Sequence, residues 1–292
     1  MIPTARTLRC RQIVEADLDA VVSLLTRGFP DRDSAFWRNA LALLGGHEPP
    51  SGLAKYGYLM ESGGEAVGVV LLICSATPDS DGPAIRCNLS SWYVDPPFRA
   101  YAPILVSQAI RNKDVTYLNV SPAPHTRAII EAQGFSCYSH GVFVAVPLLH
   151  GFFGRSKAQV FDGNRRPDVK HDQRVQQLLE RHATYGCVSL WCVADGRAYP
   201  FVFRRRRLYG FIPIVQLIYC SDLSDFVHFA GPVGYELARR GVLLAIMDAN
   251  APVAGLAGFY MNGHRPKYFK GPKPPRLGDL AYTEYAMMGA TL

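Results

Sequence analysis

The sequence predicts a mixed α/β protein whose two halves share one plan. Two observations support this prediction. Apolar runs with β-strand composition alternate with runs of helical periodicity along the 292 residues. In addition, the order of elements in the second half repeats part of the order in the first. We place the halves at residues 1–150 and 169–292, joined by a linker at 151–168.

The first half opens with an expected strand and two helices, the second of which has Ser34 as its N-cap. Turn residues 62–65 then join two strands as in a β-hairpin. A third strand, a helix, a strand, a second helix ending at Gly134 and a last strand complete the order β-α-α-β-β-β-α-β-α-β. The strands are expected at 7–13, 56–61, 66–75, 84–94, 115–120 and 141–148.

The second half begins with an amphipathic helix at 171–182, whose apolar stripe includes His182. A histidine in that position is more often a core residue with satisfied hydrogen bonds than a ligand. Asp195-Gly196 is a strong hairpin signal between two strands. The remaining elements are expected as strands at 208–220, 242–247 and 280–287 and as helical pattern at 222–240.

Composition narrows the range of partners. The net charge of +7 favours anionic partners such as CoA, acyl carriers, nucleic acid or anionic lipid. The seven cysteines include no C-x-x-C pair, and the eight histidines show no metal-ligand spacing, so we expect neither a disulfide framework nor a metal. No signal peptide and no transmembrane segment are visible, so a cytoplasmic location is the default expectation.

One stretch, Ser90–Leu105, organises the chain. A β-rich run ends at Val94, two prolines break it, and a helical pattern then begins. The N–H groups at the start of a helix are natural partners for phosphate.

This stretch resembles the pyrophosphate loop of the GNAT superfamily of acyl-CoA N-acyltransferases, which reads V-x-P-x-x-R/Q-G-x-G-x-G/A. Val94, Pro96 and Arg99 match that pattern. The glycine positions hold Ala100, Ala102 and Ile104.

A second segment, Ala128–Phe135, resembles the family's A-x-x-Y-E-K-x-G-F signature. Ala128, Glu131, Gly134 and Phe135 match it, while Ile130 stands at the tyrosine position. That tyrosine is the usual acid that protonates the departing thiolate, and an isoleucine cannot donate a proton.

The resemblance implies transfer of an acyl group from acetyl-CoA or another acyl-CoA to an amine of a small molecule or peptide. It implies that main-chain N–H groups near a split between the two central strands polarise the thioester carbonyl. The implied acyl-CoA contacts are Val94, Arg99, Ala100, Tyr101, Ala102 and Ile104. The candidate catalytic residues are Asp95, Tyr93 and Ser121, with Tyr101, Tyr138 and His125 as further candidates.

Each of these residues also has a structural interpretation. Asp95 is more simply a turn carboxylate, and His125 a polar residue at a helix start. For Arg99 a phosphate contact is the favoured interpretation and a solvated surface arginine the alternative, because an arginine at a helix start fits better when an anion sits there. In the second half, the corresponding loop carries Asp222 and Asp225, which would repel phosphate. We therefore expect only the first half to bind CoA, as in tandem relatives with one working site.

Two alternatives to an enzyme remain open. A non-catalytic acyl-CoA-binding or structural relative would explain Ile130 and the missing glycines. A binding module would use the run Arg204, Arg205, Arg206, Arg207 against nucleic acid or an anionic membrane, although a solvated strand edge is the simpler interpretation. We expect that run at an exposed strand end, because a buried sheet face would not accommodate two arginines. Lys267–Arg276 is expected as a basic loop, and the oligomeric state is left open.

Overall fold

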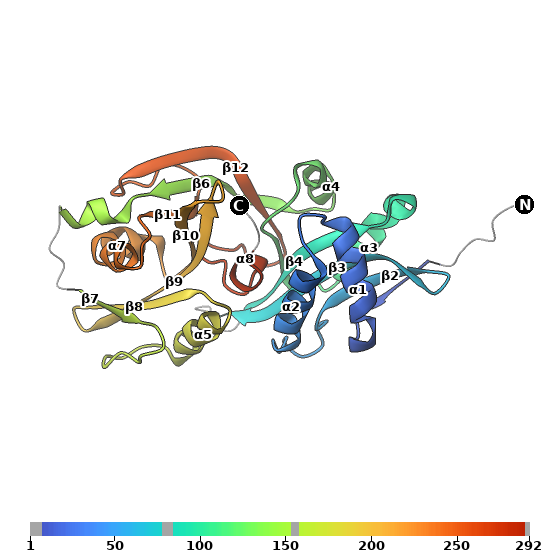
Figure 1. Ribbon diagram of the computed structural model, residues 1–292, viewed down its shortest axis with the longest axis horizontal. Helices are drawn as coiled ribbons and strands as arrows, with labels where there is room; N and C mark the ends of the chain where they lie inside the picture. The colour runs from blue at the N-terminus through green and yellow to red at the C-terminus, as the bar shows by residue number, and fades with distance from the viewer. Residues whose placement is uncertain (1–7, 78–83, 153–157, 290–292) are drawn as a thin grey trace, which may run out of the picture. The chain divides into compact units, whose positions relative to one another are not determined.

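The computed structural model describes residues 8–77, 84–152 and 158–289 (Figure 1). Residues 78–83, between two expected strands, and part of the expected linker lie outside these residues. The chain forms two compact units, and each is described here by itself. Unit 1 comprises Met1–Ser136 and Tyr268–Pro274, and unit 2 comprises Cys137–Lys267 and Pro275–Leu292.

Residues 8–145 follow the order of elements expected for the first half, but the last strand of that order, β6 (Ser136–Ala145), lies in unit 2. The sheet of unit 1 has the strand order β1-β2-β3-β4-β5 followed by the last residues of β12, with β4 and β5 parallel. The elements are β1 (Leu8–Gln12), α1 (Leu18–Gly28), α2 (Ser34–Gly45), β2 (Gly57–Ser62), β3 (Glu65–Thr77), β4 (Ala84–Val94), α3 (Ala102–Ala109), β5 (Thr116–Asn119) and α4 (Arg127–Ala132).

The two N-terminal helices bury one apolar face each. Leu24 and Leu25 of α1 and Leu44 of α2 are fully buried, and α1 packs on β3 and β4 (Figure 1). The N-cap of α2 is Asp33, not the expected Ser34, because the Asp33 carboxylate accepts the Phe36 N–H at 2.7 Å.

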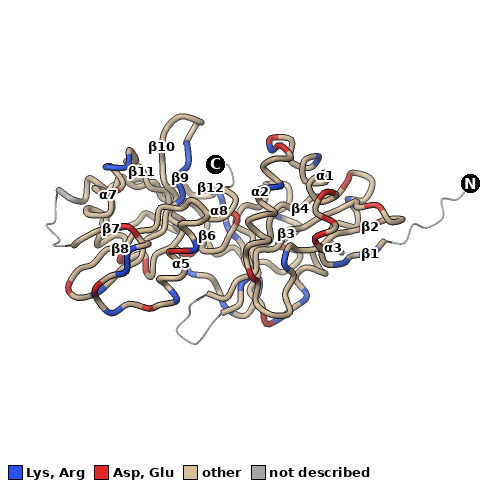
Figure 2. Tube along the Cα trace, turned by 60° about the horizontal axis from the view of Figure 1, so that its bottom comes forward, with Lys and Arg blue, Asp and Glu red and all other residues tan. Residues whose placement is uncertain are grey.

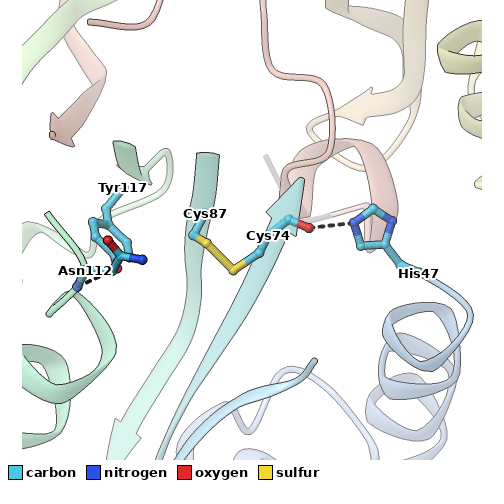
Figure 3. Close-up of a disulfide and its surroundings, with 5 residues drawn as sticks. All are labelled: His47, Cys74, Cys87, Asn112 and Tyr117. Carbon is cyan, nitrogen blue, oxygen red and sulfur yellow. Dashed lines mark hydrogen bonds between the residues drawn. A yellow bond between two sulfur atoms is a disulfide. The ribbon is translucent and has the colours of Figure 1, made fainter. Parts of the chain in front are cut away.

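A buried disulfide joins β3 to β4, contrary to our expectation that the cysteines would not pair (Figure 3). Cys74 and Cys87 stand directly opposite each other in the antiparallel ladder. His47 lies 2.9 Å from the Cys74 carbonyl oxygen through its Nε2. The pairing is a consequence of strand register, which cysteine spacing alone does not reveal.

Unit 2 is a second mixed sheet, with the strand order β12-β6-β11-β10-β9-β8-β7 and with β10 and β11 parallel. A cluster of buried aromatic and aliphatic side chains, including Phe203, Phe226 and Leu237, forms its core. The elements are β6 (Ser136–Ala145), β7 (Gln159–Asp162), α5 (Gln173–Thr184), β8 (Val188–Ala194), β9 (Arg197–Leu208), β10 (Ile212–Cys220), α6 (Leu223–His228), α7 (Ala230–Arg239), β11 (Leu244–Ala249), β12 (Gly258–Lys270) and α8 (Glu284–Met287).

Several expectations for the second half were wrong. Residues 280–287 were expected as a strand, but Glu284–Met287 forms α8, since a short apolar run has no decisive period. The basic segment expected as a loop is a loop at 271–276, but its first four residues, 267–270, form the end of β12. The compact units also differ from boundaries at 150 and 169, because β6 belongs to unit 2 and Tyr268–Lys270 of β12 belong to unit 1.

His182 is a core histidine, as expected. It is fully buried, its Nδ1 lies 2.8 Å from the Leu178 carbonyl oxygen, and its Nε2 accepts the Tyr282 N–H at 3.1 Å. Among the described residues, no three metal-ligating side chains gather as a metal site. No helix in the described part of the chain is long and apolar enough to cross a bilayer.

Candidate functional site

The central feature of unit 1 is the point at which β4 and β5 stop pairing. The parallel ladder joins Cys87 to Tyr117 and ends with Asn88 opposite Leu118. β4 nevertheless continues to Val94 and remains paired with β3 on its other side. The main-chain groups of β4 beyond Asn88 are therefore not used in a ladder with β5.

A β-bulge lies in this unpaired part of β4. Leu71 faces Ser90 and Val69 faces Tyr93, so two β4 residues stand opposite Val70 alone. Ser91, inside the bulge, has a φ of 52°. Bulges bend a strand and re-aim its groups, and a left-handed serine is a strained conformation that is enriched at functional sites.

Asn88 lies where the two strands part, and its side-chain amide is buried there. Its side chain is 1% exposed, and neither Oδ1 nor Nδ2 has a hydrogen-bond partner among the described residues. Leaving a buried polar group unsatisfied costs about 1–3 kcal/mol. Such a group in a native fold calls for a ligand or an ordered water, and Asn88 is a residue that sequence analysis did not single out.

Asp95 and Tyr93 lie together at the end of β4. Arg27 of α1 donates to both Asp95 oxygens, with Nη2–Oδ2 at 2.9 Å and Nε–Oδ1 at 3.4 Å. This ion pair raises the pKa of Arg27 and ties Asp95 down, so Asp95 is poorly placed to act as a base. Burial, reinforced by Asp95, raises the pKa of Tyr93, so its hydroxyl stays protonated near neutral pH.

Gly28 makes room for the Tyr93 ring. A Cβ at Gly28 would lie 2.4 Å from Tyr93 Cγ, which is closer than real contacts allow. Sequence analysis missed both Arg27 and Gly28. A glycine at the end of a helical pattern indicates the end of the helix, but nothing in the sequence shows which side chain packs against that glycine.

The expected phosphate loop differs from its prediction. A 3-10 helix at Pro96–Tyr101 precedes α3, so the helical turns begin at two prolines that have no N–H. The next N–H, of Phe98, bonds to the Asp95 carbonyl oxygen at 2.9 Å. The first turn therefore offers few main-chain donors, and Arg99 is the cationic side chain on this loop.

Arg99 is exposed, and its guanidinium has no hydrogen bond or ion pair among the described residues, although its carbonyl oxygen accepts the Ala102 N–H. Tyr101 and Ile104 are also exposed beside it, whereas Val94 is buried. The two alanines of the loop lie at the surface, Ala100 exposed and Ala102 partly so.

The remaining candidates surround the end of β5. Ser121 is exposed two residues after β5, and His125 is exposed in a short 3-10 turn. Ile130 is buried in α4, so the side chain at this position packs in the interior of unit 1.

In unit 2, the parallel strands β10 and β11 also part, but another segment of the chain bonds to β10 beyond that point. The ladder between β10 and β11 ends at Gln216 opposite Ile246, and a bulge follows. Beyond that pair, the chain's own segment Gly278–Leu280 bonds to β10. The Leu280 N–H donates to the Ile218 carbonyl oxygen at 2.7 Å, and the Cys220 N–H donates to the Gly278 carbonyl oxygen at 3.0 Å. We call Gly278–Leu280 the plug segment.

The helix start after β10 is also occupied. Asp222 caps α6 by accepting the Ser224 N–H at 2.7 Å, and this bond helps to lower the pKa of Asp222. Its carboxylate thus stands where an anion would bind.

No family model and no curated protein matches this sequence. Solved structures do match. A GCN5-related N-acetyltransferase from Anabaena variabilis is similar with a TM-score of 0.58 and 9% identity, over 90% of this chain and 72% of that one. A putative acetyltransferase from Pyrococcus horikoshii is similar with a TM-score of 0.56 and 12% identity, over 96% of this chain and 95% of that one. A probable N-acyltransferase from Enterococcus faecalis is similar with a TM-score of 0.58 and 10% identity, over 94% of this chain and 74% of that one.

Identities this low establish the fold alone. The likeness nevertheless extends over nine-tenths or more of this chain in each case. This likeness agrees with the arrangement found in both units, in which a hairpin is followed by two parallel strands that part, β4 and β5 in unit 1 and β10 and β11 in unit 2. The chain therefore has the fold of the GCN5-related N-acetyltransferases, the superfamily that the motifs around Val94 and Gly134 resemble.

Proposed function

We propose that the chain is an acyl-CoA-dependent N-acyltransferase with one working site, in unit 1. The observation that carries the proposal is the parting of β4 from β5 after Asn88, together with the bulge at Ser91. That geometry leaves strand N–H and C=O groups available to an extended ligand such as the pantetheine arm of CoA. Unit 2 has the same geometry, but the plug segment uses it.

The proposed reaction is direct transfer. The amine nitrogen of a small-molecule or peptide acceptor attacks the thioester carbonyl carbon, the C–S bond breaks, and CoA leaves as a thiolate. The amine proton passes to water. Main-chain N–H groups of β4 beyond its ladder with β5 would stabilise the oxyanion, which is commonly a large contribution to such reactions. Arg99 would contact phosphate, because an exposed guanidinium suits that charge and geometry.

Tyr93 is the proposed acid in place of a tyrosine at position 130. The phenol is protonated near neutral pH, as a donor to a departing thiolate must be, and after donation it regains a proton from water. Asp95, held by Arg27, then serves to orient the Tyr93 hydroxyl.

A second candidate is a non-catalytic acyl-CoA-binding protein. It is favoured by the buried Ile130 and by the scarcity of main-chain donors at Pro96–Phe98. The two candidates differ in turnover and not in binding, so one experiment separates them.

The experiment measures binding and thiol release on the same samples. A thermal-shift series with CoA thioesters detects binding through stabilisation of the native state. Thiol release is then followed with a broad amine panel between pH 7 and 9. The enzyme predicts amine-dependent release, whereas binding without release across the panel supports the second candidate.

Arg99→Ala tests the phosphate contact. It should weaken CoA binding by about 1–3 kcal/mol, the range for hydrogen bonds to charged groups. Arg9→Ala is the matched control, because Arg9 is an exposed arginine on β1 of the same unit. Equal effects of the two substitutions would remove the loop from the site.

A further inference from the structure

The four-arginine run of β9 is divided between the two faces of its strand. Arg204 donates to the main-chain carbonyl oxygens of Tyr185 and Ala286, and the Arg206 guanidinium lies 4.7 Å from the centroid of the Tyr285 ring. The buried face therefore accommodates two arginines after all, because main-chain oxygens and an aromatic ring receive them. Arg205 and Arg207 alternate to the other face and are exposed.

The exposed pair borders a hollow of about 330 Å³ in unit 2. The hollow lies where β9 and the start of β10 meet the end of α7. Its lining contains no acidic residue and consists of Arg205, Arg206, Arg207, Pro213, Ile214, Arg240, Gly241 and Val242. Figure 2 shows basic positions along β9 toward its turn into β10.

The charge around the hollow is only partly neutralised. Glu236 accepts from Arg240 at 3.0 Å and from Arg239 at 3.4 Å, so one carboxylate serves two guanidinium groups. Arg205 reaches a neutral partner, the Arg240 carbonyl oxygen, at 3.4 Å. Arg207 has no hydrogen bond or ion pair with any residue that the structure describes. The hollow therefore has an excess of positive charge that an anion would neutralise.

Two exposed aromatic rings stand next to this charge. Tyr209 and Phe211, 80% and 72% exposed, form the turn between β9 and β10 on either side of Gly210. Arg207 lies opposite Pro213 in the same hairpin, immediately below the turn. Arginines beside exposed aromatic rings are the pattern that binds single-stranded nucleic acid, because phosphates pair with the guanidinium groups and bases stack on the rings.

We propose that this surface of unit 2, Arg205, Arg207, Arg240, Tyr209 and Phe211, binds a segment of single-stranded nucleic acid. The phosphate groups lie in the hollow, and unstacked bases cover the turn. A flexible strand can place a phosphate inside a hollow, whereas the surface of a bilayer is too broad to enter one. The site is independent of the acyltransferase proposal, since none of its residues belongs to unit 1.

The test is the salt dependence of binding to a fluorescent single-stranded RNA 12-mer of mixed sequence, measured by anisotropy. Each phosphate contact contributes about 0.7 to the slope of log affinity against log salt concentration for single strands. The variant R205Q/R207Q/R240Q should therefore lower that slope by about 2. The variant Y209A/F211A should weaken binding by roughly thirtyfold or more, at about 1–3 kcal/mol for each of two stacked bases, and leave the slope unchanged, because stacking is not ionic.

The control variant R165Q/R166Q/R197Q removes the same charge from exposed positions elsewhere in unit 2. It should keep the wild-type slope to within about 0.5, while thermal unfolding confirms that all three variants fold. Equal losses of slope in the two arginine variants would mean diffuse attraction and overturn the proposal. Binding to vesicles with 30% phosphatidylserine, without binding to the RNA, would also overturn it in favour of a membrane surface.

Discussion

Asn88 of β4 lies opposite Leu118 of β5 as the last pair of their parallel ladder. Beyond this pair, β4 continues for six residues, to Val94, without a ladder to β5. Unit 2 has a corresponding last pair, after which the plug segment binds the strand. In unit 2 the plug segment bonds to the strand beyond that pair, whereas among the described residues no further strand pairs with β4 on that side, and this difference is the physical basis for expecting one acyl-CoA site in this chain.

Asn88→Leu should separate stability from function. Removing an unsatisfied buried amide in favour of an apolar group of similar size should raise the free energy of unfolding by about 1 kcal/mol. The same change should lower acyl-CoA affinity or amine-dependent thiol release, because we expect the buried amide to bind the acyl-CoA or acceptor. Chemical denaturation and the thiol assay measure the two effects.

A loss of stability in Asn88→Leu would show that the amide is hydrogen-bonded in the folded protein, either to a protein group or to an ordered water. Unchanged binding and turnover would show that Asn88 does not serve the site.

Tyr93→Phe tests the proposed acid. Loss of a general acid costs a factor of about 10²–10⁴ in rate. A free thiol has a pKa of about 8.5, so CoA can leave unprotonated at alkaline pH. The variant should therefore be slow at pH 7 and recover as the pH rises toward 9. A uniform loss across this range would point to a structural role for the ring.

Gly28→Ala perturbs Tyr93 in a second, independent way, because the added methyl would displace the Tyr93 ring. We expect its rate profile to follow that of Tyr93→Phe. Gly46→Ala is the matched control, since its methyl would meet only atoms at 3.7 Å or beyond. Identical profiles for Gly46→Ala and Gly28→Ala would contradict the account.

Arg11 and Asp17 should make stability depend on pH. Arg11 donates to both oxygens of Asp17, at 2.6 and 2.8 Å, and these bonds hold the pKa of Asp17 below its usual value. A depressed carboxyl pKa stabilises the fold above the unfolded pKa of about 3.9 and loses this contribution as the pH falls through the folded value.

Arg11→Gln should therefore lower the free energy of unfolding by about 1–2 kcal/mol at pH 7. The difference from wild type should shrink as the pH falls below about 4. Denaturant titrations at pH 7, 5 and 3 measure it, and a constant difference at all three would show that packing of Arg11 dominates.

Gly278→Ala should loosen the plug segment. Its φ is 77°, and an added Cβ would lie 2.8 Å from the Cys220 sulfur and 3.0 Å from a Leu223 methyl. Gly263→Ala shares the positive φ but would meet nothing within 4 Å. We expect Gly278→Ala to destabilise the protein by about 1–3 kcal/mol more than Gly263→Ala, as overpacking does. Equal losses of stability in the two variants would mean that the positive φ alone explains the effect, and that the packing of the plug segment against Cys220 and Leu223 adds nothing to stability.

The sequence predicts those features that local patterns encode. Alternation, turn residues and helical spacing were enough for the element order of unit 1 and for the role of His182. Features that depend on contacts between distant segments were missed. The ion pair of Arg27 with Asp95 spans 68 residues, and the Cys74–Cys87 bond depends on strand register.

The plug segment shows the same limit. Residues 278–280 have no strand pattern of their own, and they bond to β10 because its main-chain groups are left without a partner there. Likewise, the prolines at 96 and 97 indicated a break in the strand, but not that they would begin the helical turns themselves.

The most direct test of the central claim is the stoichiometry of CoA binding to the full chain by isothermal titration calorimetry. The account predicts one CoA per chain, with affinity reduced by Arg99→Ala and unchanged by Asp222→Ser. Two CoA molecules per chain, or binding that Asp222→Ser alters and Arg99→Ala does not, would contradict a single site in unit 1.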